Sequence, residues 1–142
     1  MTLSAWQSWA ILSAVFAALT AIFAKVGVEG ISSDLATFYR TLVVIVALGL
    51  LLLVTGQFEL PKGLSINTWT FLTLSGLATG ASWFCYFRAL KLGNASQVAS
   101  LDKLSVVLVA VFAAVFLGER LSGMNWAGVA LIGLGAVLVA VR

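Results

Sequence analysis

Histidine is absent from the 142-residue chain, and cysteine occurs once, at Cys85. A single cysteine excludes a disulfide within the chain, and without histidine one chain cannot assemble a zinc site of the Cys/His type. The Ser-His-Asp and Cys-His arrangements of nucleophilic catalysis are excluded for the same reason. We therefore expect no enzyme activity, no bound metal and no cofactor.

Charge is also scarce, because the chain has eight Lys/Arg and five Asp/Glu, and 62% of its residues are hydrophobic. Soluble domains usually have about 25% charged and about 45–50% apolar residues. The basic residues stand singly between apolar runs and form no basic stripe, which argues against nucleic-acid binding. This distribution is typical of a protein whose main solvent is the lipid bilayer.

Five apolar stretches are present, and each is close to the ~20 residues that cross a hydrocarbon core at about 1.5 Å per residue. The residues from Ser32 to Asp34 supply capping side chains for the start of the second stretch. The sequence therefore predicts an all-α membrane protein with a single five-helix transmembrane domain over residues 1–142. The expected helices cover about 9–28, 35–54, 69–90, 96–117 and 124–141.

Charged residues inside these stretches are expected to gather in one half of the bilayer, because successive helices alternate in direction. Lys25 is near the end of the first stretch, Arg40 near the start of the second, and Asp102 and Lys103 near the start of the fourth. Asp102 is too short to reach the interface and needs a cation or a wet cavity, for which Arg40 is the natural candidate. Adjacent helical residues do not share a face, so we expect Asp102 and Lys103 to point apart.

This cluster has two interpretations, a structural ion pair that fixes helix register or a solute pathway. Its excess of cations favours an anionic or zwitterionic solute. Aromatic side chains near polar groups suit a small-molecule cavity, although plain packing is an equal alternative for them. The candidate residues for substrate binding or gating are Lys25, Arg40, Trp83, Tyr86, Asp102, Lys103 and Ser105.

Three runs carry a family resemblance: Gly80-Ala-Ser-Trp-Phe-Cys-Tyr-Phe-Arg-Ala-Leu90, Leu101-Asp-Lys-Leu-Ser-Val106 and Leu117-Gly-Glu-Arg-Leu121. They resemble the EamA-type transporters of the drug/metabolite transporter superfamily, and within it the short five-helix bacterial and archaeal branch. The resemblance implies a multi-pass transporter of the bacterial or archaeal inner membrane. Larger members contain two five-helix halves of inverted topology, which implies that this chain is one half and works as a dimer.

An antiparallel homodimer requires that the chain insert in both orientations, and the Lys/Arg count bears on this requirement. Two basic residues, Lys62 and Arg120, lie on the side of the N-terminus, against six on the other side. Three of these six, Lys25, Arg40 and Lys103, are expected to face the bundle. Without them, two basic residues on the side of the N-terminus stand against three on the other side. That near balance is compatible with dual topology. The six residues are Lys25, Arg40, Arg88, Lys91, Lys103 and Arg142.

The leading functional prediction is a transporter of a small metabolite that works by alternating access as a homodimer or as a pair with a similar chain. A non-transporting scaffold or accessory subunit is the alternative. A cationic-drug exporter is a weaker one, because it would need an acidic residue in the middle of the first helix, and residues 9–24 contain none. If transport is coupled to protons, Asp102 is the acid placed deep enough to carry one.

Overall fold

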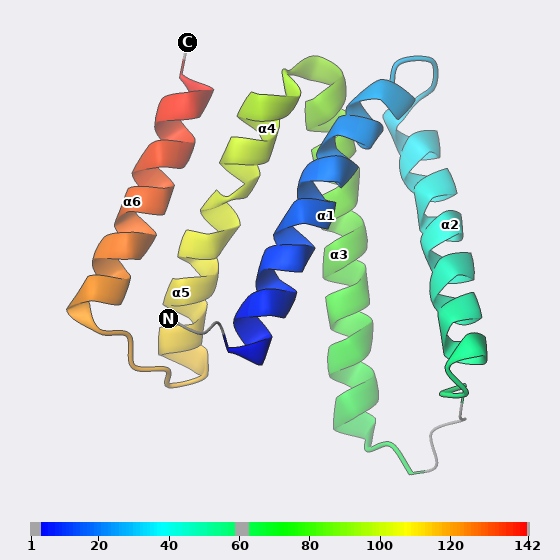
Figure 1. Ribbon diagram of the computed structural model, residues 1–142, viewed down its shortest axis with the longest axis horizontal. Helices are drawn as coiled ribbons and strands as arrows, with labels where there is room; N and C mark the ends of the chain where they lie inside the picture. Colours follow the sequence, from blue (N-terminus) through cyan, green and yellow to red (C-terminus); the bar gives the residue numbers. More distant parts are fainter. Residues whose placement is uncertain (1–3, 59–62, 142) are drawn as a thin grey trace. The chain divides into compact units, whose positions relative to one another are not determined.

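A computed structural model describes residues 4–58 and 63–141, so Lys62 and Arg142 of the charge count lie outside the described residues. Within those two ranges the regular secondary structure is entirely α-helical (Figure 1). The prediction of an all-α membrane protein is confirmed. The helices are α1 (Ala5–Gly27), α2 (Ser33–Val54), α3 (Ile66–Leu92), α4 (Ala95–Asp102), α5 (Leu104–Phe116) and α6 (Gly123–Ala140).

Four segments of the described chain are long and apolar enough to cross a membrane: α1, α2, the stretch Ala95–Phe116 and α6. The helix α3 is the longest, with 27 residues, but it is less apolar than the other four. The prediction of five equivalent spans therefore holds for four of them, and α3 is a long helix of mixed polarity. Its serine and threonine residues are Thr68, Thr70, Thr73, Ser75, Thr79 and Ser82.

The fourth expected helix is interrupted at Lys103, where one continuous helix over 96–117 was predicted. The Lys103 amide donates to the Ser100 carbonyl, and the Val106 amide donates to the Lys103 carbonyl, both at 3.0 Å. These bonds span three residues instead of four, which is the spacing of a 3₁₀ turn. The Ser100 hydroxyl also donates to the Ser96 carbonyl at 2.8 Å, a contact that bends helices. The result is two helices, α4 and α5.

The helix ends are closed by local hydrogen bonds. The Ser32 hydroxyl accepts from the Leu35 amide at 3.2 Å, which confirms that capping residues begin α2. At the other end of α2, Gly56 has a φ of 66°, and the Gln57 amide donates to the Leu52 carbonyl at 3.0 Å. This left-handed glycine with its six-to-one bond is a Schellman ending, which satisfies carbonyls that the helix leaves unpaired.

The chain divides into two compact units, one of residues 1–25 with 92–142 and one of residues 26–91. We call the first the α6 unit, which contains most of α1 together with α4, α5 and α6. We call the second the α2–α3 unit, which contains α2 and most of α3. The single five-helix domain over 1–142 stays a prediction.

Small residues allow close packing in the α6 unit, where α6 lies against both α4 and α5. A Cβ atom added to Gly133 would stand 3.1 Å from the Val107 Cγ2 atom of α5. The side chains of Ala110, Ala113 and Ala136 are buried. In lipid, helices associate through such close backbone approach, since apolar side chains gain little by leaving the hydrocarbon.

Replacing Gly133 with leucine should therefore separate α5 from α6, since the new side chain would overlap Val107. We expect a loss of about 1–3 kcal/mol in stability, the usual cost of overpacking, measured as thermal unfolding of the full chain in detergent. Gly135→Leu in the same helix is the matched control, because a Cβ atom there meets nothing within 4 Å. Equal destabilisation by both substitutions would contradict the packing argument.

Candidate functional site

The start of α2 and the end of α3 are joined by two polar contacts in the α2–α3 unit. The Lys91 ammonium donates to the Ile31 carbonyl at 2.6 Å, and the Arg88 Nε atom lies 3.7 Å from Asp34 Oδ1. The Ser33 hydroxyl also donates to Asp34 Oδ1, at 3.0 Å. Because these contacts join opposite ends of the two helices, α2 and α3 run antiparallel (Figure 1).

Arg40 lies deeper in the same unit, seven residues after the start of α2 and so about 10 Å along it. Its guanidinium carbon stands over the Trp83 ring, 4.1 Å from the centroid, and 5.5 Å from the Phe87 centroid. The positive charge is thus held by aromatic faces of α3, among which Phe87 is buried.

No carboxylate among the described residues of the α2–α3 unit lies within 4 Å of Arg40. Asp34, the acidic residue of α2, lies against Arg88 instead. Arg40, Trp83 and Tyr86, which the sequence singled out separately, therefore lie together in one unit. The predicted pairing of Arg40 with Asp102 involves different units and stays a prediction.

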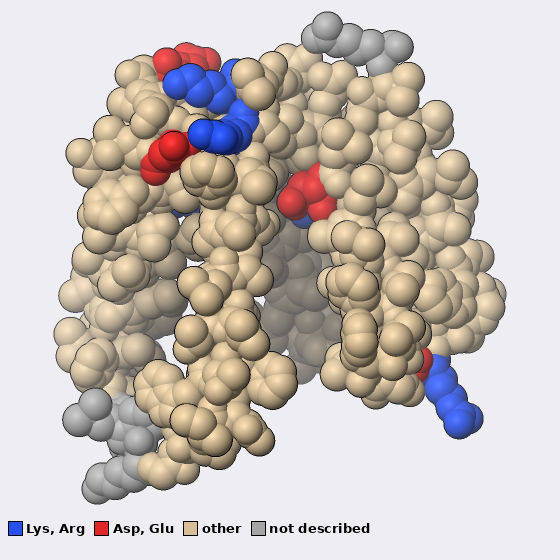
Figure 2. Space-filling view, turned by 180° about the vertical axis from the view of Figure 1, so that it is seen from behind, with Lys and Arg blue, Asp and Glu red and all other residues tan. Residues whose placement is uncertain are grey.

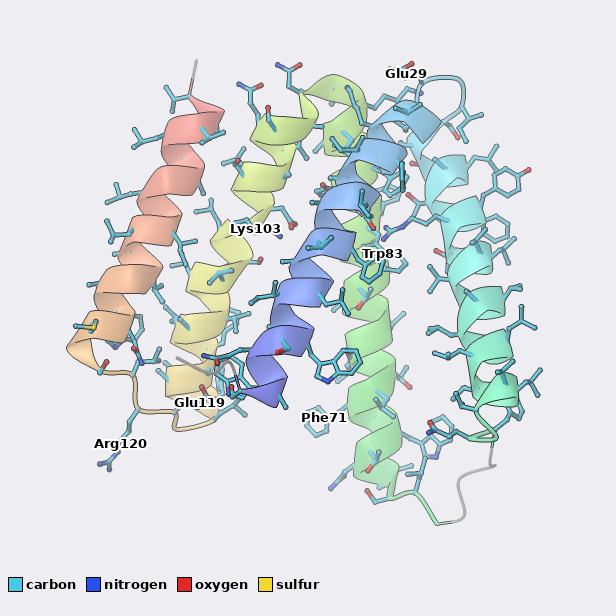
Figure 3. All side chains as sticks on the ribbon, viewed as in Figure 1. Glu29, Phe71, Trp83, Lys103, Glu119 and Arg120 are labelled. Carbon is cyan, nitrogen blue, oxygen red and sulfur yellow. The ribbon has the colours of Figure 1, made fainter. Side chains whose placement is uncertain are left out.

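Asp102 and Lys103 lie at the break between α4 and α5, where Figure 3 labels Lys103. The Lys103 ammonium is 3.7 Å from Asp102 Oδ2. The expectation that these two side chains would point apart is wrong, because the 3₁₀ turn at Lys103 and its long side chain bring the charges together. Ser105 follows in the first turn of α5. A proton-carrying role for Asp102 stays a prediction.

Lys25, the remaining candidate, donates from its ammonium to the Gly93 carbonyl at 2.9 Å within the α6 unit. Gly93 directly follows the last residue of α3, so the lysine satisfies a carbonyl at a helix end. This contact gives Lys25 a structural role. Its participation in gating stays a prediction.

Charged side chains occupy small areas on an otherwise uncharged face (Figure 2).

The sequence interpretation did not select Phe87, Arg88 or Asp34 as site residues. Phe87 follows Trp83 by four positions, which places both rings on one face of α3. That spacing was available in the sequence, whereas the Arg88–Asp34 contact depends on the register of α3 against α2.

The comparisons with known proteins agree with this architecture. A family model described as the EamA-like transporter family matches residues 4–141. The chain belongs to this family. It is also 60% identical over 136 residues to a Sinorhizobium sp protein named "Uncharacterized transporter in cobO 3′region", with 96% of each chain covered. No solved structure matches the chain.

Membership in the EamA-like family confirms the resemblance predicted from the three sequence runs. It places the chain among multi-pass membrane transporters of the drug/metabolite transporter superfamily. The name of the Sinorhizobium relative identifies a transporter and names no substrate.

The Arg88–Asp34 pair should contribute little to stability, since its side chains are 59% and 54% exposed. A double-mutant cycle with Asp34→Asn and Arg88→Gln, measured by thermal unfolding in detergent, should give a coupling energy of about 0.2–1 kcal/mol. The coupling should fall at high salt because the charges are screened. A salt-independent coupling above ~2 kcal/mol would contradict this expectation.

Proposed function

We propose that this EamA-family protein transports a small anionic or zwitterionic metabolite across the bacterial or archaeal inner membrane, working by alternating access as an antiparallel homodimer. The observation that carries the proposed substrate class is Arg40. Its cation lies within a candidate span and rests on Trp83 and Phe87. In the proposed transporter, this cation attracts the negative group of the solute.

The argument begins with the energy of a charge in the membrane. An arginine at the centre of a spanning helix costs at least about 2.5–3.5 kcal/mol, and less toward the interface. Aromatic faces offset about 0.5–2 kcal/mol of such a cost without neutralising the charge. Arg88 has a carboxylate nearby, whereas the described part of the unit offers none to Arg40. Within the described part of this unit, no carboxylate therefore neutralises the charge that would attract a solute.

The distribution of charge along the unit supports the same sign of solute. Three cations, Lys91, Arg88 and Arg40, occur at increasing distance from the end where α2 begins and α3 ends. The acidic residues of the unit's described part are Glu29 and Asp34, both toward that end. Lys91 and Arg88 equal these two acids in number, so the net positive charge of the unit's described part lies deeper, at Arg40. A net positive charge raises the local concentration of anions. An anion or zwitterion entering from this end therefore meets net positive charge at the depth of Arg40.

The polarity of α3 supports a dimer. Every residue from Ile66 to Ser82 is exposed, and this segment includes the hydroxyls of all six Ser and Thr side chains of α3. Two of these hydroxyls, on Thr70 and Thr79, donate back to carbonyls of their own helix at 2.9 Å. A helix of this polarity is better covered by protein or a wet pathway than by lipid tails. A second, inverted chain would supply that cover and complete an inverted-repeat transporter.

Substitution of Arg40 tests the proposed substrate class. Arg40→Gln should lower counterflow uptake of amino acids and carboxylic acids into proteoliposomes by about tenfold or more, because a charge-assisted contact is lost. Gln57→Ala, an uncharged exposed position just beyond α2 that leaves the balance of basic residues unchanged, is the control and should transport like the wild type. Wild-type activity in Arg40→Gln, or wild-type transport of quaternary ammonium cations alone, would overturn the proposal.

Membrane topology tests the assembly. C-terminal reporter fusions to alkaline phosphatase and to green fluorescent protein should both be active, because the basic residues that set orientation are nearly balanced. Adding two lysines to the α5–α6 turn should favour one orientation and reduce transport. Co-expression with a copy biased in the opposite direction should restore it. Activity of a single reporter in the wild type would exclude the antiparallel homodimer.

A further inference from the structure

The Arg40 guanidinium lies over the ring of Trp83, a side chain with no conventional hydrogen-bond acceptor. The Trp83 ring covers the guanidinium carbon at 4.1 Å. The group has five N–H donors in its plane. None of them donates a hydrogen bond to another described residue of the α2–α3 unit. Within this unit the charge is therefore supported by a ring, and its donors have no described hydrogen-bond acceptor.

Donors of this kind require a polar partner at membrane depth, since a polar group without a hydrogen bond is costly in a low-dielectric environment. Arg40 is half-buried, so part of the residue is accessible. A guanidinium edge fits the two oxygens of a carboxylate through two parallel N–H···O bonds. A lysine ammonium lacks this paired geometry. The guanidinium edge thus matches a planar oxyanion.

The number of available charges sets the charge of the ligand. Arg88 lies against Asp34, and the Lys91 ammonium is engaged by the Ile31 carbonyl, so Arg40 supplies one positive charge at this depth. A carboxylate carries one negative charge, which this guanidinium balances. A phosphate monoester carries about −1.5 to −2 at neutral pH and would leave excess charge away from water.

We infer that Arg40 is the receptor for a monocarboxylate group of the transported solute, with Trp83 as the positioning residue that supports the guanidinium while its edge binds the two carboxylate oxygens. This inference rests on the proposed function and narrows it to solutes that carry one carboxylate at the bound end, such as amino acids and simple carboxylic acids. Trp83 acts through Arg40 and has no direct bond to the ligand.

The test compares carboxylates with the corresponding amides, which lack the carboxylate charge, on the full-length protein in detergent. The probes are glycine, leucine and benzoate, then glycinamide, leucinamide and benzamide, and inorganic phosphate, each followed by the shift in thermal unfolding with concentration. At least one carboxylate should stabilise the wild type, its amide should bind about tenfold or more weakly, and phosphate should bind weakly as well. The amide comparison needs no substitution, so it does not depend on a variant that folds.

Variants distinguish the effect of the two parallel hydrogen bonds of the guanidinium edge from the effect of its charge alone. Arg40→Lys retains the charge and should weaken carboxylate binding by about tenfold. Trp83→Leu should weaken it by a few-fold, whereas Trp83→Phe, which restores an aromatic face, should recover much of it. Gln57→Ala, which leaves the balance of basic residues unchanged, should bind like the wild type. Wild-type affinity in Arg40→Lys, or equal stabilisation by a carboxylate and its amide, would overturn the inference.

The outcomes also distinguish this inference from the proposed function. If phosphate stabilises the wild type as strongly as the carboxylates and Arg40→Gln abolishes both effects, an anion site exists and the monocarboxylate assignment is wrong. If no carboxylate and no phosphate stabilises the wild type, both proposals fail. If the carboxylates bind but are not transported in proteoliposomes, the inferred receptor stands and the transport function fails.

Discussion

The hydrocarbon core of a bilayer offers no water to backbone carbonyls or charged groups, so the chain must supply their partners itself. Several long polar side chains do this at helix ends. Lys91 donates to the Ile31 carbonyl in the α2–α3 unit, and Lys25 donates to the Gly93 carbonyl in the α6 unit. Gln97 reaches the carbonyl of Ala140 at the end of α6. Each contact satisfies a backbone carbonyl near a helix end and joins segments that are distant in sequence.

The two units use different kinds of side chain to hold their helices. In the α6 unit, α6 lies close to α4 and α5 along small residues such as Gly133. In the α2–α3 unit, the helices meet through the long side chains of Arg40, Arg88 and Lys91. Close backbone approach leaves little room for a ligand. Helices held by long polar and aromatic side chains leave space between their backbones, which suits the proposed solute site.

The sequence predicted the helical composition well because hydropathy and capping are local properties. The five expected ranges all fall on helices, and Ser32 begins α2 as anticipated. The interruption at Lys103 was missed because neither proline nor glycine marks it. It depends on hydrogen bonds around Ser96 and Ser100. The mixed polarity of α3 is visible in the sequence as its hydroxyl residues. The length of the stretch and its apolar residues nevertheless favour the prediction of a membrane span.

The site was predictable only in part, because contacts between helices are not local properties of the sequence. The sequence identified Arg40, Trp83 and Tyr86 as candidates by residue type and depth. The contact of Arg40 with Trp83 depends on the register of α2 against α3, to which hydropathy is insensitive. Formal charge indicates only carboxylates as partners of a cation. An aromatic ring carries no formal charge, although its quadrupole attracts cations.

The choice between a ring and a carboxylate as the partner of a buried cation has functional consequences. A carboxylate neutralises the cation and competes directly with an incoming anion, as Asp34 would for a ligand at Arg88. A ring stabilises the cation but leaves its net charge and its edge donors intact, as at Arg40. A transporter must also release what it binds, so an overly strong site would slow turnover. In the proposed transporter, one cation supported by rings would give moderate, reversible attraction, because no carboxylate of its own unit would have to be displaced when the solute binds.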